Sequence, residues 1–252
     1  MMAFFQAILY QPIFNGFIAL YNVIPDIGIV ILIITILIKL ILYPLTSSSI
    51  KSQKALTDLQ PKLEEIKKKY GKEQQKIAQE TMKLYKDNKV NPLASCLPLL
   101  VQLPILISLY YVLRVVLSAD VDFALLYPFV SEPESIKTIS LGFIELGNIS
   151  PILAVLAGGA QFWQAKMMSR KKPPKEAGAG GKDEGMASMM NKQMLYMMPV
   201  LTVVIGFKLP GGLTLYWFLS TLFTALQQLV VFKKKDVGDK PKDDGVIEGK
   251  IV

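Results

Sequence analysis

The chain has 252 residues, of which 52% are hydrophobic, and its formal net charge is +8. Several uncharged apolar runs reach the length of about 20 residues that a membrane span needs, which excludes an ordinary soluble domain. One cysteine and no histidine exclude an internal disulfide and a Cys/His metal cluster, so we expect no cofactor and no metal.

The sign of the charge alternates along the chain. Residues 1–25 carry no charge, whereas residues 47–91 hold eleven Lys against six acidic residues. Residues 118–150 hold one Lys against five acidic residues, and residues 169–192 hold six basic against three acidic residues. This alternation follows the positive-inside rule and predicts a polytopic protein with its N-terminus outside and its C-terminus in the cytoplasm. The basic pI therefore reflects topology, and we expect no DNA partner.

The N-terminal apolar region divides into two segments. Residues 1–24 are interrupted by Pro12 and polar residues, which favours an outer interfacial segment over the alternative of an extra span. Residues 25–46 are the first predicted span, and beyond Asp26 at its start the span contains one charge, Lys39, together with Thr35. A charge at the centre of a spanning helix costs roughly 2.5–3.5 kcal/mol, which makes Lys39 a candidate functional residue. The alternative is that its amine reaches along the helix to the nearer interface.

Residues 47–91 predict a cytoplasmic helical hairpin. Pro61 suits a helix start, Gly71 ends the first arm, and Glu73 to Lys86 form the return arm. Two interpretations stay open: a solvated surface hairpin, or a contact arm for a partner or for the lipid surface.

The second half of the chain alternates apolar spans and polar connections. Span two contains Gln102, and span three has Gln161 and Gln164 on one helix face. Span five carries Tyr216 and Trp217. The predicted segments are span two (92–118), an extracytoplasmic loop with several hydrophobic residues (119–150), span three (151–168), a flexible basic loop (169–192), span four (193–208), an outer turn (209–212), span five (213–232) and a disordered cytoplasmic tail (233–252).

Two local patterns in these segments have alternative explanations. The Gly158–Gly159–Ala160 run permits close contact between helices. A methionine cluster at the start of span four is either an adaptable apolar surface or filler in helix packing.

No catalytic motif is evident. The chain lacks a Gly-rich phosphate loop, a G-x-S-x-G motif and an H-E-x-x-H motif. Lys39 is the one general acid or base that we expect inside the membrane, because the other charged residues of the predicted spans lie near their ends, so we expect no enzymatic activity.

Three motifs carry a resemblance to a known family. They are KLILYPL at 39–45, NPLASCLPLLVQLPI at 91–105 and PGGLTLYW at 210–217, accompanied by LQPK at 59–62 in the hairpin. In this order they resemble the YidC/Oxa/Alb family of membrane protein insertases over residues 20–232.

The resemblance implies an all-α fold in which five transmembrane helices surround a hydrophilic groove open to the cytoplasm. It implies a client-binding groove that carries a positive residue, normally Arg, where this chain has Lys39. Gln102 and Gln161 match polar groove positions of the family, and Trp217 matches an aromatic one. The full set of groove candidates is Lys39, Thr35, Gln102, Gln161, Gln164, Tyr216 and Trp217.

The implied activity is insertion and folding of newly made membrane proteins in the bacterial cytoplasmic membrane. The implied partners are nascent membrane proteins and the lipid bilayer. The basic loop and tail would contact the ribosome, and the hairpin 47–91 would contact the Sec translocon and targeting factors. Two alternatives remain: an ion or solute transporter or channel that uses Lys39, and an assembly chaperone without insertase activity.

Overall fold

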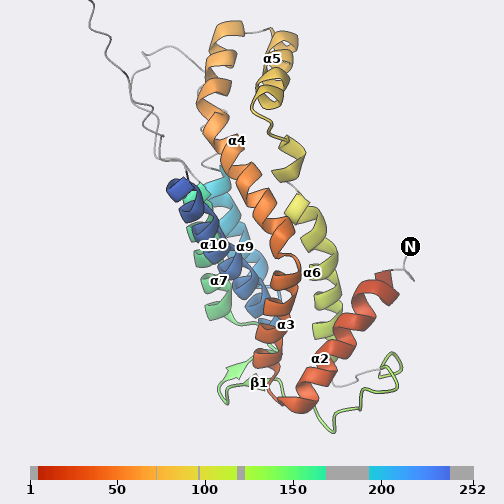
Figure 1. The fold of residues 1–252 in the computed structure, drawn as a ribbon. Helices are drawn as coiled ribbons and strands as arrows, with labels where there is room; N and C mark the ends of the chain where they lie inside the picture. The colour runs from red at the N-terminus through yellow and green to blue at the C-terminus, as the bar shows by residue number, and fades with distance from the viewer. Residues whose placement is uncertain (1–4, 72, 96, 118–122, 169–192, 239–252) are drawn as a thin grey trace, which may run out of the picture.

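The chain folds into a bundle of long helices with a helical hairpin extending from one end (Figure 1). The computed structural model describes residues 5–71, 73–95, 97–117, 123–168 and 193–238. Its helices are α2 (Gln11–Val23), α3 (Ile27–Ile41), α4 (Tyr43–Tyr70), α5 (Gln74–Asp87), α6 (Leu97–Val116), α7 (Pro151–Met168), α9 (Met198–Gly206) and α10 (Gly211–Gly238). Short π or 3₁₀ turns η1 (Gln6–Tyr10), η2 (Pro92–Ser95) and η3 (Gln193–Met197) precede α2, α6 and α9. The predicted helical class is confirmed, apart from a small hairpin of β1 (Ile139–Ser140) and β2 (Ile144–Glu145), which was not predicted.

Among the helices of the described ranges, only α10 is by itself long and apolar enough to cross a membrane, over Gly211–Lys233. Helices α3 and α4 satisfy the same test only together, and they are bent by 68° at the break between them. The five predicted spans therefore stay a prediction. The predicted flexibility of the loop 169–192 and disorder of the tail beyond Gly238 lie outside the described residues.

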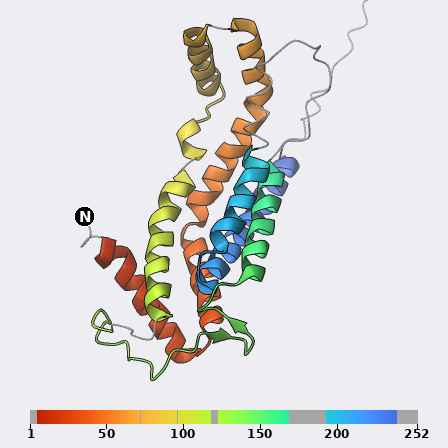
Figure 2. The ribbon, with the colours of Figure 1, turned by 180° about the vertical axis from the view of Figure 1, so that it is seen from behind.

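Helix α2 lies obliquely across the end of the bundle opposite the hairpin, and the polar residues that interrupt this apolar segment do not break the helix (Figures 1 and 2). Pro12 falls in its first turn, where the missing N–H is tolerated. The side chain of Asn15 donates to the carbonyl of Leu125 at 3.0 Å and accepts from the N–H of Tyr127 at 2.6 Å. The polar residues of α2 thus hold the loop that follows α6. Whether α2 lies at a membrane interface stays a prediction.

Within the segment 25–46, which the sequence predicts as the first span, the chain bends at Leu42 between α3 and α4. Pro44 has no N–H for the carbonyl four residues earlier, and its ring crowds that turn. The hydroxyl of Thr46 donates to the carbonyls of Leu42 and Tyr43 at 2.9 and 3.1 Å, which satisfies carbonyls at the bend. The bend redirects α4 into the projecting hairpin.

The hairpin α4–α5 turns at Gly71, as the sequence predicts, and Gly71 has a φ of 55° that other residues disfavour. The predicted helix start at Pro61 is wrong, because α4 continues through Pro61 from Tyr43 to Tyr70. The first half of α4 lies against the end of α10, where the Lys54 ammonium stands 4.7 Å from the centre of the Phe232 ring. Helix α10 itself extends past the predicted boundary at 232 to Gly238.

The second half of the bundle is closely packed. Helix α7 covers the same residues as predicted span three, and it contacts both α9 and α10. A Cβ atom at Gly158 would lie 2.3 Å from Val203 Cγ2, so this glycine permits the predicted close approach. A Cβ at Gly159 would meet nothing within 4 Å. In α6, only Pro104 is interior, because the helix begins at Leu97 and Pro98 falls in its first turn.

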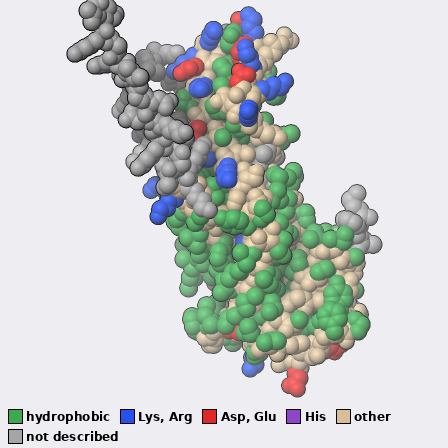
Figure 3. All heavy atoms as spheres, in the orientation of Figure 1, with side chains coloured by type: hydrophobic (Ala, Val, Ile, Leu, Met, Phe, Trp, Pro, Cys, Tyr) green, Lys and Arg blue, Asp and Glu red, His purple; other side chains and the backbone are tan. Residues whose placement is uncertain are grey.

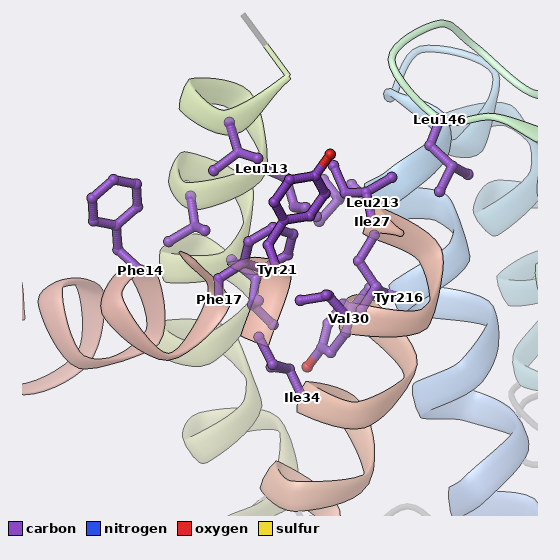
Figure 4. Packing of buried hydrophobic residues seen from close by; sticks show 14 of the residues in the cluster. Phe14, Phe17, Tyr21, Ile27, Val30, Ile34, Leu113, Leu146, Leu213 and Tyr216 are labelled. Carbon is purple, nitrogen blue, oxygen red and sulfur yellow. The ribbon is translucent and has the colours of Figure 1, made fainter. Parts of the chain in front are cut away.

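The hydrophobic core lies at the end of the bundle opposite the hairpin, between α2, α3, α6 and α10 (Figure 4). In α2 the buried side chains follow helical spacing at Phe14, Phe17, Ile18 and Tyr21. Charged side chains gather on the hairpin, whereas hydrophobic side chains cover the middle of the molecule (Figure 3). On the face that Figure 3 shows, this apolar surface below the charged hairpin is the kind of surface that contact with a lipid bilayer requires.

Candidate functional site

Lys39 points across the bundle toward α10. Its Nζ donates a hydrogen bond to Thr224 Oγ1 at 2.9 Å. This hydrogen bond joins α3 to α10, two helices that run in the same direction (Figure 1). In this structure the amine therefore reaches sideways to a neighbouring helix rather than along α3 to the interface.

The ammonium of Lys39 is half-buried, and no carboxylate of the described residues forms an ion pair with it. Among the described residues, its hydrogen-bond partner is the neutral hydroxyl of Thr224, which in turn donates to the carbonyl of Ser220 at 2.9 Å. The hydrogen bond positions the amine, and no carboxylate of the described residues compensates its positive charge. A partly desolvated, uncompensated cation attracts anions more strongly than a surface lysine does.

Helix α10 carries a row of polar side chains, which we name the α10 polar row: Tyr216, Ser220, Thr224 and Gln227. They recur every three or four residues, the spacing of one helix face. The Tyr216 hydroxyl is hydrogen-bonded to Ser220 and accepts from Gln102 Nε2 at 2.5 Å. The row thus connects α6 at one end with Lys39 of α3 farther along.

The last member of the row, Gln227, secures the bend between α3 and α4. Its Nε2 donates to the Tyr43 carbonyl at 3.1 Å, to Thr46 Oγ1 at 2.9 Å and to Ser47 Oγ at 2.8 Å. Because Gln227 is only 8% exposed, these bonds satisfy an amide that burial would otherwise destabilise. The row therefore joins the position of Lys39 to the base of the hairpin.

The other predicted site residues are placed differently. Thr35 is fully buried, and its hydroxyl donates to the carbonyl of Ile31 at 2.6 Å, so that hydroxyl is occupied within its own helix. Gln161, Gln164 and Trp217 are partly exposed. Within the described part of the chain, their side chains make none of the hydrogen bonds of the α10 polar row.

Sequence reasoning missed Ser220 and Thr224. The four-residue spacing from Tyr216 through both of them was a usable signal, because it places a polar stripe on an otherwise apolar helix. Two buried polar atoms of the described residues, Ser108 Oγ and Gln228 Oε1, lack a hydrogen-bond partner. The described residues contain no group of three His, Cys, Asp or Glu side chains that could hold a metal ion. The arrangement offers one cation with neutral hydroxyl and amide groups, which suits attraction of anionic groups.

Comparison with known proteins places this arrangement in a family. A family model described as "60Kd inner membrane protein" matches residues 19–239. A protein of Fusobacterium nucleatum subsp. nucleatum named "Membrane protein insertase YidC" is 41% identical over 208 residues, which cover 82% of this chain and 86% of that protein. The chain belongs to the YidC/Oxa/Alb family.

Two further relatives are longer than this chain. "Membrane protein insertase YidC 1" of Listeria monocytogenes is 37% identical over 214 residues, which cover 81% of this chain and 64% of that protein. A solved structure, "Active YidC insertase crystal structure with the first transmembrane domain resolved", is 26% identical with a TM-score of 0.56. That match covers 88% of this chain and 46% of the solved one, so this chain spans about half the length of its solved relative.

Proposed function

We propose that this protein inserts newly made membrane proteins into the bacterial cytoplasmic membrane and assists their folding. The observation that carries the proposal is the ammonium of Lys39, which Thr224 holds beside the α10 polar row and which no carboxylate of the described residues neutralises. The names of the family relatives, membrane protein insertases, support the same function.

The proposed mechanism is electrostatic and needs no nucleotide or cofactor. A client's polar N-terminal tail, often acidic, has to cross a layer of low dielectric constant. An acidic side chain at mid-membrane costs roughly 2.5–3.5 kcal/mol. An ammonium and a carboxylate 4 Å apart attract each other by about 4 kcal/mol at an effective dielectric constant of 20. Attraction by Lys39 is therefore of the right size to offset the cost for one carboxylate.

The proposed topology uses α3, α6, α7, η3 with α9, and α10 as five spans, with the N-terminus outside and the C-terminus inside. A hydrophilic groove would open to the cytoplasm and to lipid, and the client's apolar segment would leave it sideways into the bilayer. The partly exposed candidates would contact the client, and the buried ones would support them. The proposed contacts are Lys39, Gln102, Gln161, Gln164 and Trp217; the proposed supports are Thr35 and Tyr216.

The proposed partners are nascent membrane proteins and lipid. The projecting hairpin α4–α5 would capture clients and contact targeting factors or the Sec translocon, a role that its charged surface supports (Figure 3). The basic loop and the tail would contact ribosomal RNA through a salt-dependent attraction.

Lysine in place of the family's usual arginine limits the kinds of contact that the groove can make with a client. Arg presents a planar fork that binds a carboxylate through two hydrogen bonds, whereas Lys is a compact point charge. We therefore propose that the charge, and not a forked contact, is what this groove requires.

The test uses purified protein in liposomes with a single-span client that has an acidic N-terminal tail. Protease protection measures tail translocation for wild type, Lys39→Arg and Lys39→Ala, with the exposed Lys208→Ala as a matched control. We expect wild type, Lys39→Arg and Lys208→Ala to insert the client, and Lys39→Ala to be at least about tenfold slower, the equivalent of 1.4 kcal/mol.

Insertion by Lys39→Ala at the wild-type rate would refute the role of the charge. If wild type inserts no better than empty liposomes, crosslinking to clients already in the bilayer would identify a chaperone. Ion flux through the same liposomes would instead identify a channel.

A further inference from the structure

The β1–β2 hairpin near the outer end of α3 presents apolar side chains to its surroundings. Ile139, Leu141 and Phe143 are 50%, 58% and 78% exposed. They occupy alternate positions along the chain, at the end of the hairpin where β1 turns toward β2. Three exposed hydrophobic side chains at one turn form a local apolar patch, unlike an isolated exposed side chain, which needs no explanation.

The turn itself places a hydrophobic residue where backbone geometry disfavours it. Leu141 and Gly142 both have positive φ, 51° and 80°, and the N–H of Phe143 donates to the carbonyl of Ser140 at 3.2 Å. Two central residues with positive φ are the requirement of a type I′ turn, in which Asn-Gly is strongly preferred. The turn would therefore form more easily with Asn than with Leu at position 141, so folding does not explain the leucine.

The base of the hairpin is firmly attached to the bundle. Asp26 caps α3 by accepting from the N–H groups of Gly28 and Ile29. The same carboxylate accepts from the hydroxyl of Ser140 at 2.5 Å and from the N–H of Leu141 at 2.7 Å. The turn is therefore held in place with its apolar side chains directed outward.

The patch lies beside an apolar surface that begins at the same end of the bundle. Ile149, just before α7, is 53% exposed, and Ile152 and Val155 in α7 are 74% and 57% exposed. The hairpin lies near the start of α7 in Figure 1, and the same side of the molecule is covered by hydrophobic side chains in Figure 3. A molecule or lipid layer that contacts this surface of α7 would therefore also reach the turn of the hairpin.

We propose that the hairpin 139–145 is an interfacial anchor that inserts Ile139, Leu141 and Phe143 into the outer leaflet of the lipid bilayer. The apolar character of the patch and its continuity with the exposed face of α7 select lipid as the occupant. The anchor also has a consequence for Lys39, because Asp26 joins the hairpin to α3. Thirteen residues at 1.5 Å each place Lys39 about 20 Å farther along the helix, so the anchor fixes the depth of the ammonium in the bilayer. This proposal does not depend on the insertase function.

The experiment measures the immersion of single labelled positions in pure phospholipid liposomes. Cys96→Ser removes the only native thiol, and Phe143→Cys is labelled with the environment-sensitive fluorophore NBD. Ser135→Cys, at an exposed position of the same loop, is the matched control. The liposomes carry nitroxide-labelled lipids, which quench only fluorophores near the acyl chains.

We expect a blue-shifted emission and strong quenching at position 143, and water-like emission with little quenching at position 135. Because these liposomes contain no other protein, water-like emission at 143 would overturn the proposal and leave a protein partner as the occupant. Thermal unfolding of each labelled variant at the wild-type temperature verifies that it is folded.

A second variant, Leu141→Asn, separates lipid contact from folding of the turn. Asn tolerates positive φ well, so the hairpin should fold at least as well as in wild type. Since Asn removes one of the three apolar side chains, we expect the quenching at position 143 to fall at least twofold. Unchanged quenching would overturn the proposed contribution of Leu141 to the anchor.

Discussion

The close contact between α7 and α9 makes two adjacent glycines respond in opposite ways to the same substitution. In Gly158→Ala, the new Cβ would lie 2.3 Å from Val203 Cγ2 and 3.1 Å from the carbonyl oxygen of Pro199. Val203 is β-branched and stiff in a helix, and the carbonyl is backbone, so neither can yield easily. The two helices would have to move apart. In Gly159→Ala, the new Cβ would enter open space.

The magnitudes follow from two opposing contributions to the free energy of unfolding. Replacing Gly by Ala inside a helix stabilises it by about 0.5–1 kcal/mol. Overpacking a well-packed contact costs about 1–3 kcal/mol, and overlap with a stiff side chain and the backbone favours the upper part of that range. We expect Gly158→Ala to destabilise the protein by about 1–2 kcal/mol and Gly159→Ala to stabilise it by about 0.5–1 kcal/mol.

Thermal unfolding in detergent, followed by circular dichroism, measures both variants against wild type. The second-site variant Val203→Ala removes the atom that Gly158→Ala would strike. The double variant should therefore be more stable than the two single effects predict when added together. Equal changes for both glycine variants, or strictly additive effects in the double variant, would refute the proposed contact between α7 and α9.

Three further predictions concern polar contacts. Gln227→Leu leaves hydroxyl and carbonyl groups at the α3–α4 bend without their amide donor, so we expect the free energy of unfolding to fall by about 1–3 kcal/mol. We also expect faster hydrogen exchange at residues 43–50, and unchanged exchange there would contradict this prediction. Thr224→Val keeps the charge of Lys39 but removes its hydrogen-bond partner, so client insertion should fall between that of wild type and Lys39→Ala; insertion as slow as in Lys39→Ala would contradict a role based on charge alone. The third prediction concerns Asp26, which precedes α3. Burial raises the pKa of its carboxyl, but hydrogen bonds from Ser140 and from backbone N–H groups have the larger combined effect and lower the pKa below its usual value. The ionised carboxylate therefore stabilises the folded state above its usual pKa, and this stabilisation is lost as the pH falls through the lowered pKa. The difference in thermal stability between wild type and Asp26→Asn should accordingly shrink on acidification below pH ~4. A difference that is independent of pH would contradict this prediction.

Local features of the chain were predictable from sequence because their causes lie within a few residues. Apolar runs gave the helical class, and Gly71 gave the turn of the hairpin, since glycine tolerates the backbone angles that end a helix. The predicted run 151–168 coincides with α7 because Pro151 is the first residue of the helix, a position that proline favours. Lys39 could be selected as a candidate because its charge stands alone in an apolar segment.

Other features were decided only by contacts between distant parts of the chain. Lys39 and its partner Thr224 are 185 residues apart, and Gln102 and Tyr216 are 114 residues apart. Helical periodicity predicts which residues share a face, but it does not predict which helix that face meets. The polar residues of α2 illustrate the same limit, since the side chain of Asn15 finds its partners in a loop more than 100 residues away along the chain. The sequence by itself determined that the chain is mostly helical and where it carries an isolated charge, because these follow from local propensity and solvation. Only the tertiary structure decided which polar groups that charge meets and in which direction α4 leaves the bundle, because both depend on hydrogen bonds to α10.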